Sequence, residues 1–192
     1  MKTVLFVPGY QEDMESRDYT STLTMVRNQG YEVVFVPINW ERTTIDDWVS
    51  ELMATYGKLD AENTILAGFS FGAMTAFMAA TIKNPSELWL FSLAPYFHDD
   101  IQSKHMYGSW LRTLGHRRVS AFEKLDYKAL ASKVQCKTLL FAGDIEMKKW
   151  AVMKSMTNEA PKHLAHNKLT IIEGVGHDVA NPKYIAAIKS LI

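Results

Sequence analysis

The sequence predicts a single α/β domain with three layers, in which helices cover both faces of a parallel β-sheet. Six short apolar runs recur along the 192 residues, and each is continuous rather than alternating with polar side chains. Continuous runs are typical of strands that are covered on both faces. Amphipathic segments separate most of these runs, and an alternation of strand and helix implies right-handed parallel connections. The length fits one domain with a sizeable core better than two full domains.

The predicted strands are the six apolar runs, which span residues 4–7, 32–38, 64–67, 88–93, 138–142 and 169–172. The predicted helices span residues 17–29, 44–56, 71–82 and 147–159, and a last one begins at Pro182. Gly30 and Gly57 follow the first two helices, and a glycine after the last turn is a common helix stop. The fourth helix is expected to end before Pro161. Asn181 before Pro182 fits an N-cap followed by proline at the first helical position.

One connection between predicted strands is much longer than the others. About forty residues, 95–134, separate the fourth strand from the fifth. A loop of this length without its own secondary structure is unusual in a compact domain, so we expect a helical insertion that acts as a cap. In open α/β sheets, ligands bind at the carboxyl ends of the strands, and the cap is expected to cover that edge.

The composition restricts the partners and the location that we expect. Lysine plus arginine and aspartate plus glutamate number 21 each, which argues against a broad surface for nucleic acid. The single Cys136 excludes an intrachain disulfide and fits a reducing compartment. The apolar run before Pro8 is too short for a signal peptide, and no run approaches the roughly 20 apolar residues of a membrane span. We therefore expect a cytoplasmic protein with no membrane span, and the oligomeric state stays open.

The segment "AGFSFGA" at residues 67–73 carries the clearest chemical signal. Ser70 lies between Gly68 and Gly72, after a predicted strand and before a predicted helix. Small residues allow the sharp turn that exposes the serine hydroxyl, and the pattern matches the G-x-S-x-G nucleophile elbow. The backbone N–H of Phe71, at the start of the helix, can stabilise a developing oxyanion.

A serine nucleophile needs a base, and the base needs an orienting acid. His177 lies in the glycine-rich segment "EGVGHD", just after the last predicted strand, whereas the other histidines lie in the insertion or in the polar segment 163–166. We interpret His177 as the base, although a solvated loop residue is the simpler alternative. The acid is expected after the fifth strand, where "AGDIEMKK" offers both Asp144 and Glu146.

With these motifs, the sequence resembles the α/β-hydrolase superfamily over nearly its whole length. The resemblance implies a minimal member with six parallel strands in the order 2-1-3-4-5-6, and the family order of serine, acid and histidine. In this family the acid usually stands three residues beyond the glycine that ends the strand, which gives Glu146 first and Asp144 second. Asp99 and Asp100 are the third choice, because some lipases in the family take their acid from that position.

The resemblance also implies the second oxyanion donor and the type of reaction. The donor comes from the loop "VPGYQ" after the first strand, with the N–H of Tyr10 first and that of Gln11 second. The implied function is a serine hydrolase that cleaves a carboxylic ester or thioester through an acyl-enzyme on Ser70, without a cofactor or metal. Two alternatives stay open: a catalytically silent scaffold that binds a small ligand or partner, and a C–C or amide hydrolase with the same triad.

A group of aromatic side chains in the insertion could line an acyl pocket over the site. We expect this role for Tyr96, Phe97, Tyr107 and Trp110, and the expected partner is a small-molecule acyl substrate. The alternative is that these rings form the core of the insertion itself.

Overall fold

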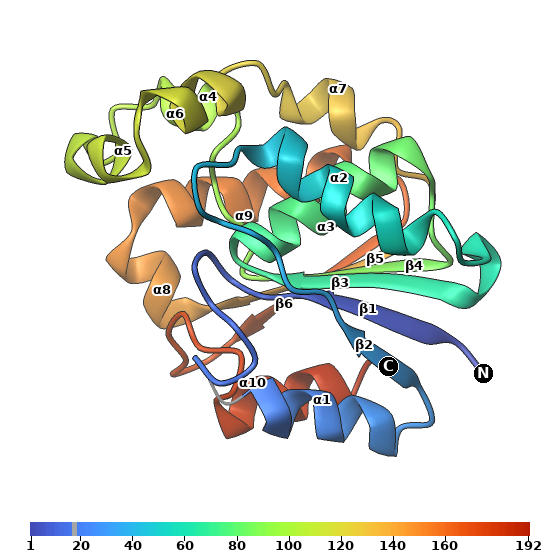
Figure 1. Cartoon of the computed structure of the whole chain (residues 1–192). Helices are drawn as coiled ribbons and strands as arrows, with labels where there is room; N and C mark the ends of the chain where they lie inside the picture. The colour runs from blue at the N-terminus through green and yellow to red at the C-terminus, as the bar shows by residue number, and fades with distance from the viewer. Residues whose placement is uncertain (17–18) are drawn as a thin grey trace.

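The centre of the protein is a six-stranded sheet in which all strands are parallel (Figure 1). The computed structural model describes residues 1–16 and 19–192. The strand order is β2-β1-β3-β4-β5-β6, which confirms the predicted topology. The strands are β1 (Thr3–Val7), β2 (Glu32–Phe35), β3 (Thr64–Phe69), β4 (Glu87–Phe91), β5 (Lys137–Gly143) and β6 (Asn167–Ile172).

Helices cover both faces of the sheet, as predicted. The helices α1 (Tyr19–Asn28) and α10 (Pro182–Lys189) lie on one face, and α2 (Ile45–Tyr56), α3 (Phe71–Ile82) and α9 (Ala151–His163) lie on the other (Figure 1). A short 3-10 helix, η1 (Ala61–Asn63), precedes β3. Each face has its own apolar core, because the buried side chains of every strand point alternately to the two helical layers. The predicted start of the first helix, at residue 17, lies outside the described residues.

The prediction of one helix over residues 147–159 is wrong, because the structure contains two. Helix α8 (Asp144–Lys149) begins directly after β5, and α9 follows it after a break at Trp150. Trp150 has an extended backbone, with φ of −124° and ψ of 106°, so the chain changes direction there. The helix also continues past Pro161, which lies in the last turn of α9 rather than beyond its end.

Two predicted strands end earlier than the apolar runs suggest. β2 ends at Phe35, and only one further ladder hydrogen bond, from the N–H of Val36 to the carbonyl of Phe6, follows it before Pro37. A proline has no N–H to continue the ladder. β4 ends at Phe91 because the next residue, Ser92, has a left-handed backbone with φ of 50°.

The segment 95–134 contains four helices, which are α4 (His98–Ile101), α5 (Gly108–Leu114), α6 (His116–Phe122) and α7 (Tyr127–Ala131). Three of them, α4 to α6, lie toward one end of the sheet, and the last, α7, lies over the helical layer near α3 (Figure 1). Arg118 on α6 joins this segment to the loop before α2. Its guanidinium donates hydrogen bonds to the carbonyls of Trp40 at 2.5 Å, Thr43 at 2.9 Å and Leu114 at 3.1 Å. Within the described chain, no helix is both long and apolar enough to cross a membrane.

Candidate active site

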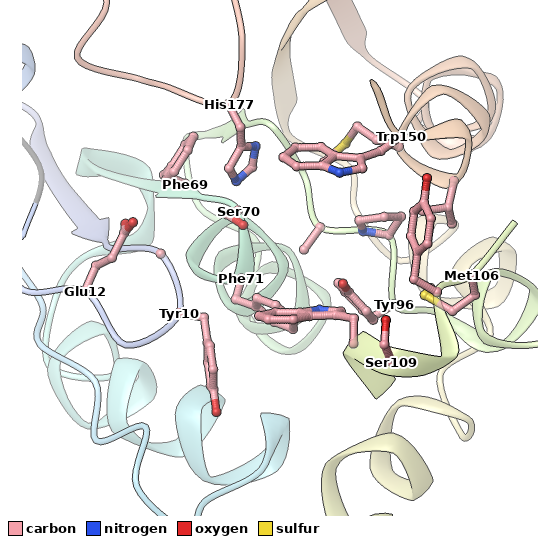
Figure 2. Close-up of a pocket in the computed structure, with 17 residues that line it drawn as sticks. Tyr10, Glu12, Phe69, Ser70, Phe71, Tyr96, Met106, Ser109, Trp150 and His177 are labelled. Carbon is pink, nitrogen blue, oxygen red and sulfur yellow. The ribbon is translucent and has the colours of Figure 1, made fainter. Parts of the chain in front are cut away.

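Ser70 lies at the turn between β3 and α3, with a strained backbone. Its φ is 56° and its ψ is −117°, a conformation that residues other than glycine rarely adopt. The chain packs closely on both sides of Ser70. A Cβ on Gly68 would lie 2.2 Å from the carbonyl oxygen of Gly72, and a Cβ on Gly72 would lie 2.2 Å from the carbonyl oxygen of Val7. Glycine at both positions therefore lets α3 pack closely on the sheet and directs the Ser70 side chain toward the cavity, as Figure 2 shows.

His177 and Glu146 are joined by a short hydrogen bond. Nδ1 of His177 lies 2.5 Å from Oε2 of Glu146, whose side chain is 0% exposed. The second carboxylate oxygen of Glu146, Oε1, accepts hydrogen bonds from the N–H of Gly143 at 2.7 Å and from the hydroxyl of Ser92 at 2.7 Å. A buried carboxylate with this many donors is held in one orientation. His177 and Ser70 line the same cavity, and in Figure 2 a ring nitrogen of His177 points toward Ser70.

The other candidate acids lie away from His177. Asp144 accepts hydrogen bonds from Nζ of Lys148 at 2.6 Å and from the N–H of Gly174 at 2.7 Å. The hydrogen bond from Lys148 lowers the pKa of Asp144. Asp144 thus fixes the loop that precedes His177. Asp99 is exposed.

Asp100 is the last of these candidate acids. Its carboxylate accepts a hydrogen bond from the N–H of Phe97 at 3.2 Å at the start of α4. Burial raises the pKa of Asp100 to about 6. The arrangement makes Asp100 part of the capping of α4, and neither it nor Asp99 is among the residues that line the cavity.

The predicted oxyanion donors also lie at the cavity. Tyr10 and Phe71 both line it, and their rings contact each other with centroids 5.4 Å apart. Gly9 and Glu12 form the turn that carries Tyr10: the N–H of Glu12 donates to the carbonyl of Gly9 at 3.1 Å. The alternative donor, Gln11, is exposed and is not among the lining residues.

The cavity above Ser70 has a volume of about 470 Å³ and a largely apolar wall. Among the predicted pocket residues, Tyr96, Tyr107 and Trp110 line it. Phe97 does not: it is 1% exposed and packs against Phe77 and Tyr127, with ring centroids 5.6 and 4.9 Å away. The expectation that Phe97 contacts a substrate is therefore wrong, because its ring belongs to the core under the cap.

Sequence reasoning missed several residues of this site. Met106, Trp150, Val152 and Met153 line the cavity. Trp150 stands at the unpredicted break between α8 and α9, and Val152 and Met153 lie in the first turn of α9. Trp150 lies inside the predicted helix 147–159, and no sequence pattern there marked the break. Trp150 also lies against His177, with ring centroids 5.5 Å apart.

Phe69 contacts the other side of the His177 ring, with a centroid distance of 4.5 Å. The imidazole therefore lies between two aromatic rings, as Figure 2 shows. Contacts of this kind restrict rotation of the ring, and an aromatic face also attracts a cation. Within residues 1–16 and 19–192, no group of three or more His, Cys, Asp or Glu side chains could hold a metal ion.

Solved structures with the same arrangement of strands and helices identify the fold. Est1E from Butyrivibrio proteoclasticus superposes with a TM-score of 0.79 at 15% identity, over 98% of this chain and 84% of Est1E. The chain has the α/β-hydrolase fold. Carboxylesterase CesB (YbfK) from Bacillus subtilis has a similar α/β-hydrolase structure, with a TM-score of 0.69 at 14% identity over 97% of this chain and 81% of CesB.

A third neighbour is alpha/beta hydrolase domain-containing protein 10 from mouse, with a TM-score of 0.67 at 15% identity over 98% of this chain and 86% of that protein. No protein-family model and no curated protein matches the sequence. The α/β-hydrolase fold seen here is a small version, since its described sheet contains only the six parallel strands.

Proposed function

We propose that this protein is a serine hydrolase that cleaves a carboxylic ester or thioester. The observation that carries the proposal is the 2.5 Å hydrogen bond between His177 and the buried Glu146, at the rim of the cavity that also exposes the strained Ser70. A buried acid, an imidazole and a serine on a nucleophile elbow are the parts that acyl transfer requires. The esterases among the structural neighbours support the same class of reaction.

The reaction begins with attack of the Ser70 hydroxyl on the acyl carbonyl. Nδ1–H of His177 donates to Glu146, which leaves Nε2 free of hydrogen to accept the serine proton. The carboxylate then stabilises the imidazolium that forms. The backbone N–H groups of Tyr10 and Phe71 hold the oxyanion, and each such donor contributes about 2.7–4 kcal/mol to lowering the barrier.

The second half of the reaction releases the carboxylic acid product. His177 gives its proton to the leaving group, the tetrahedral intermediate collapses, and an acyl-enzyme on Ser70 remains. Water then attacks the acyl carbon while His177 takes one of its protons. The second tetrahedral intermediate collapses as His177 returns that proton to Oγ of Ser70, which breaks the bond between Ser70 and the acyl group and releases the product acid.

The wall of the cavity supports an apolar acyl group. Tyr107, Trp110 and Trp150 present aromatic surface to it, and Met106 and Met153 add flexible apolar contacts. Apolar walls bind uncharged groups by removing their surface from water. Est1E has been solved with ferulic acid, an aromatic carboxylic acid, bound, which supports aromatic acyl esters as the first substrates to test.

A fluorophosphonate probe tests the proposal. We expect covalent labelling of the wild-type protein, loss of labelling in Ser70→Ala, and unchanged labelling in Ser132→Ala, an exposed serine beyond α7. A folded wild-type protein that is not labelled and does not cleave p-nitrophenyl esters would instead support the silent scaffold. Labelling at Ser70 without cleavage of any ester or thioester in a panel would favour amide or C–C bonds.

A further inference from the structure

Ser92 combines a strained backbone with complete burial, immediately after β4. Its φ is 50° and its exposed fraction is 0%. A residue other than glycine in this region costs of order 1–3 kcal/mol, and such residues gather at functional sites. Glycine would satisfy the same turn without that cost. The presence of a serine therefore calls for a role of its hydroxyl.

The hydroxyl of Ser92 lies within a buried chain of hydrogen bonds that ends at His177. It donates to Oε1 of Glu146 at 2.7 Å and lies 3.1 Å from the hydroxyl of Tyr184. The Tyr184 hydroxyl in turn lies within hydrogen-bond distance, 3.2 Å, of the carbonyl of Phe141. Ser92 gives its one proton to Glu146, and Tyr184 also has only one proton, which donates to the carbonyl of Phe141. That proton lies close enough to be shared with the oxygen of Ser92, so the Tyr184 hydroxyl restricts where the Ser92 hydroxyl can lie.

The backbone of Ser92 is held by a hydrogen bond to the neighbouring strand of the sheet. Its N–H donates to the carbonyl of Phe141 on β5 at 2.8 Å, which continues the pairing of β4 with β5 by one residue. Tyr184 on α10 is also fully buried. The hydroxyl of Ser92 is thus held from the strand on one side and from the helix on the other.

From these contacts we propose that Ser92 is a positioning residue of the active site, whose hydroxyl fixes the Glu146 carboxylate for His177. The inference rests on the proposed serine-hydrolase function. A glutamate has one more rotatable bond than an aspartate, so its carboxylate needs additional contacts to stay in one orientation. Two donors, the Gly143 N–H and the Ser92 hydroxyl, hold Oε1 and leave Oε2 directed at His177.

The test compares Ser92→Ala with Ser92→Gly. Both variants remove the hydroxyl, but only glycine also relieves the backbone strain. We expect Ser92→Gly to be the more stable of the two. We also expect both to react with the fluorophosphonate roughly 10- to 100-fold more slowly than wild type, the range that corresponds to loss of one hydrogen bond to a charged group. With an ester substrate, kcat falls by the same factor while KM stays within about twofold.

Ser86→Ala is the matched control, because Ser86 stands at the opposite end of β4. Its hydroxyl donates to the carbonyl of Thr64 at 2.9 Å, so the variant also removes one serine hydrogen bond from the edge of the same strand. We expect its labelling rate to equal that of wild type. A purely structural role for Ser92 would slow the reaction in proportion to lost stability, and then Ser92→Gly would react faster than Ser92→Ala.

A second readout does not depend on substrate. The proton between His177 and Glu146 should give a far-downfield NMR resonance in the wild-type protein, which broadens or shifts in Ser92→Gly but not in Ser86→Ala. Labelling of both Ser92 variants at the wild-type rate would overturn the inference and leave the proposed function intact. A folded wild-type protein that is never labelled would overturn the proposed function, and the inference with it.

Discussion

Replacement of Glu146 by glutamine would test the acid of the proposed triad with little change in shape. In the wild-type protein, Oε1 accepts two hydrogen bonds and Oε2 lies 2.5 Å from Nδ1 of His177. A carboxamide has one acceptor and one donor end. If the NH₂ group faces His177, Nδ1 must accept a hydrogen bond, and the ring hydrogen then lies on Nε2. An Nε2 that carries a hydrogen can no longer accept the proton of Ser70.

The opposite orientation of the carboxamide is also unfavourable. It would restore an acceptor toward His177 but place the NH₂ group against the N–H of Gly143, which donates at 2.7 Å in the wild-type protein. Two donors would then face each other in a site with no exposed surface, and an unpaired buried donor costs about 1–3 kcal/mol. The histidine is therefore expected to adopt the wrong tautomer.

The expected loss in kcat for Glu146→Gln is about 10⁴-fold, the size reported for the equivalent change in a serine protease triad. This factor corresponds to about 5 kcal/mol in the activation barrier. The assay is hydrolysis of a p-nitrophenyl ester under saturating conditions, with the thermal midpoint recorded to confirm folding. Asp144→Asn is the matched control, since Asp144 contacts Lys148 and Gly174 rather than His177, and its kcat should stay within about threefold of wild type. A larger loss in Asp144→Asn than in Glu146→Gln would refute the assignment.

Three further predictions concern stability. Gly72→Ala places a Cβ 2.2 Å from a backbone carbonyl and should lower the free energy of unfolding by more than about 3 kcal/mol. The control is Gly176→Ala, whose Cβ meets nothing within 4 Å, so the free energy of unfolding should change by less than about 1 kcal/mol. Urea unfolding measures both changes. Arg118→Met removes three hydrogen bonds to carbonyls and should cost about 1–3 kcal/mol, while Arg117→Met, at an exposed ion pair, should cost less than about 1 kcal/mol. Burial raises the pKa of Asp100 from 3.8 to about 6, so the folded state binds more protons than the unfolded state between these values, and the free energy of unfolding should fall as the pH rises through this window. The contribution of Asp100 is the difference between the wild-type protein and Asp100→Asn, and this difference should fall as the pH rises through the window. A difference that stays constant or rises would contradict the assignment.

The topology was predictable because the apolar runs were continuous and the spacers were amphipathic. The same reasoning predicted that Ser70, Glu146 and His177 lie near one another, since each follows a strand and the carboxyl ends of parallel strands meet at one edge of the sheet. The element ends were less predictable. A tryptophan in an amphipathic segment gives no sign that its backbone will be extended, so the break at Trp150 and the cavity wall it creates were missed.

The contacts that orient the site could not be read from the sequence. Ser92 stands in the run "LWLFSL", where it reads as the end of a strand. Its hydrogen bond joins residues 54 positions apart, and no local pattern encodes a pairing at that distance. Phe97 and Tyr96 are neighbours with the same apolar character, yet only Tyr96 reaches the cavity, because the direction of each ring depends on how the cap packs.

The position of His177 after the last strand has a consequence for folding. The carboxylate of Glu146 is held by Ser92 and Gly143, which lie at the ends of β4 and β5, and these contacts do not involve β6. The imidazole arrives only when β6 pairs with β5, from Thr138 opposite Asn167 to Gly143 opposite Ile172. A chain in which β6 has not paired with β5 therefore does not bring His177 to the carboxylate of Glu146, so formation of this edge of the sheet completes the proposed triad.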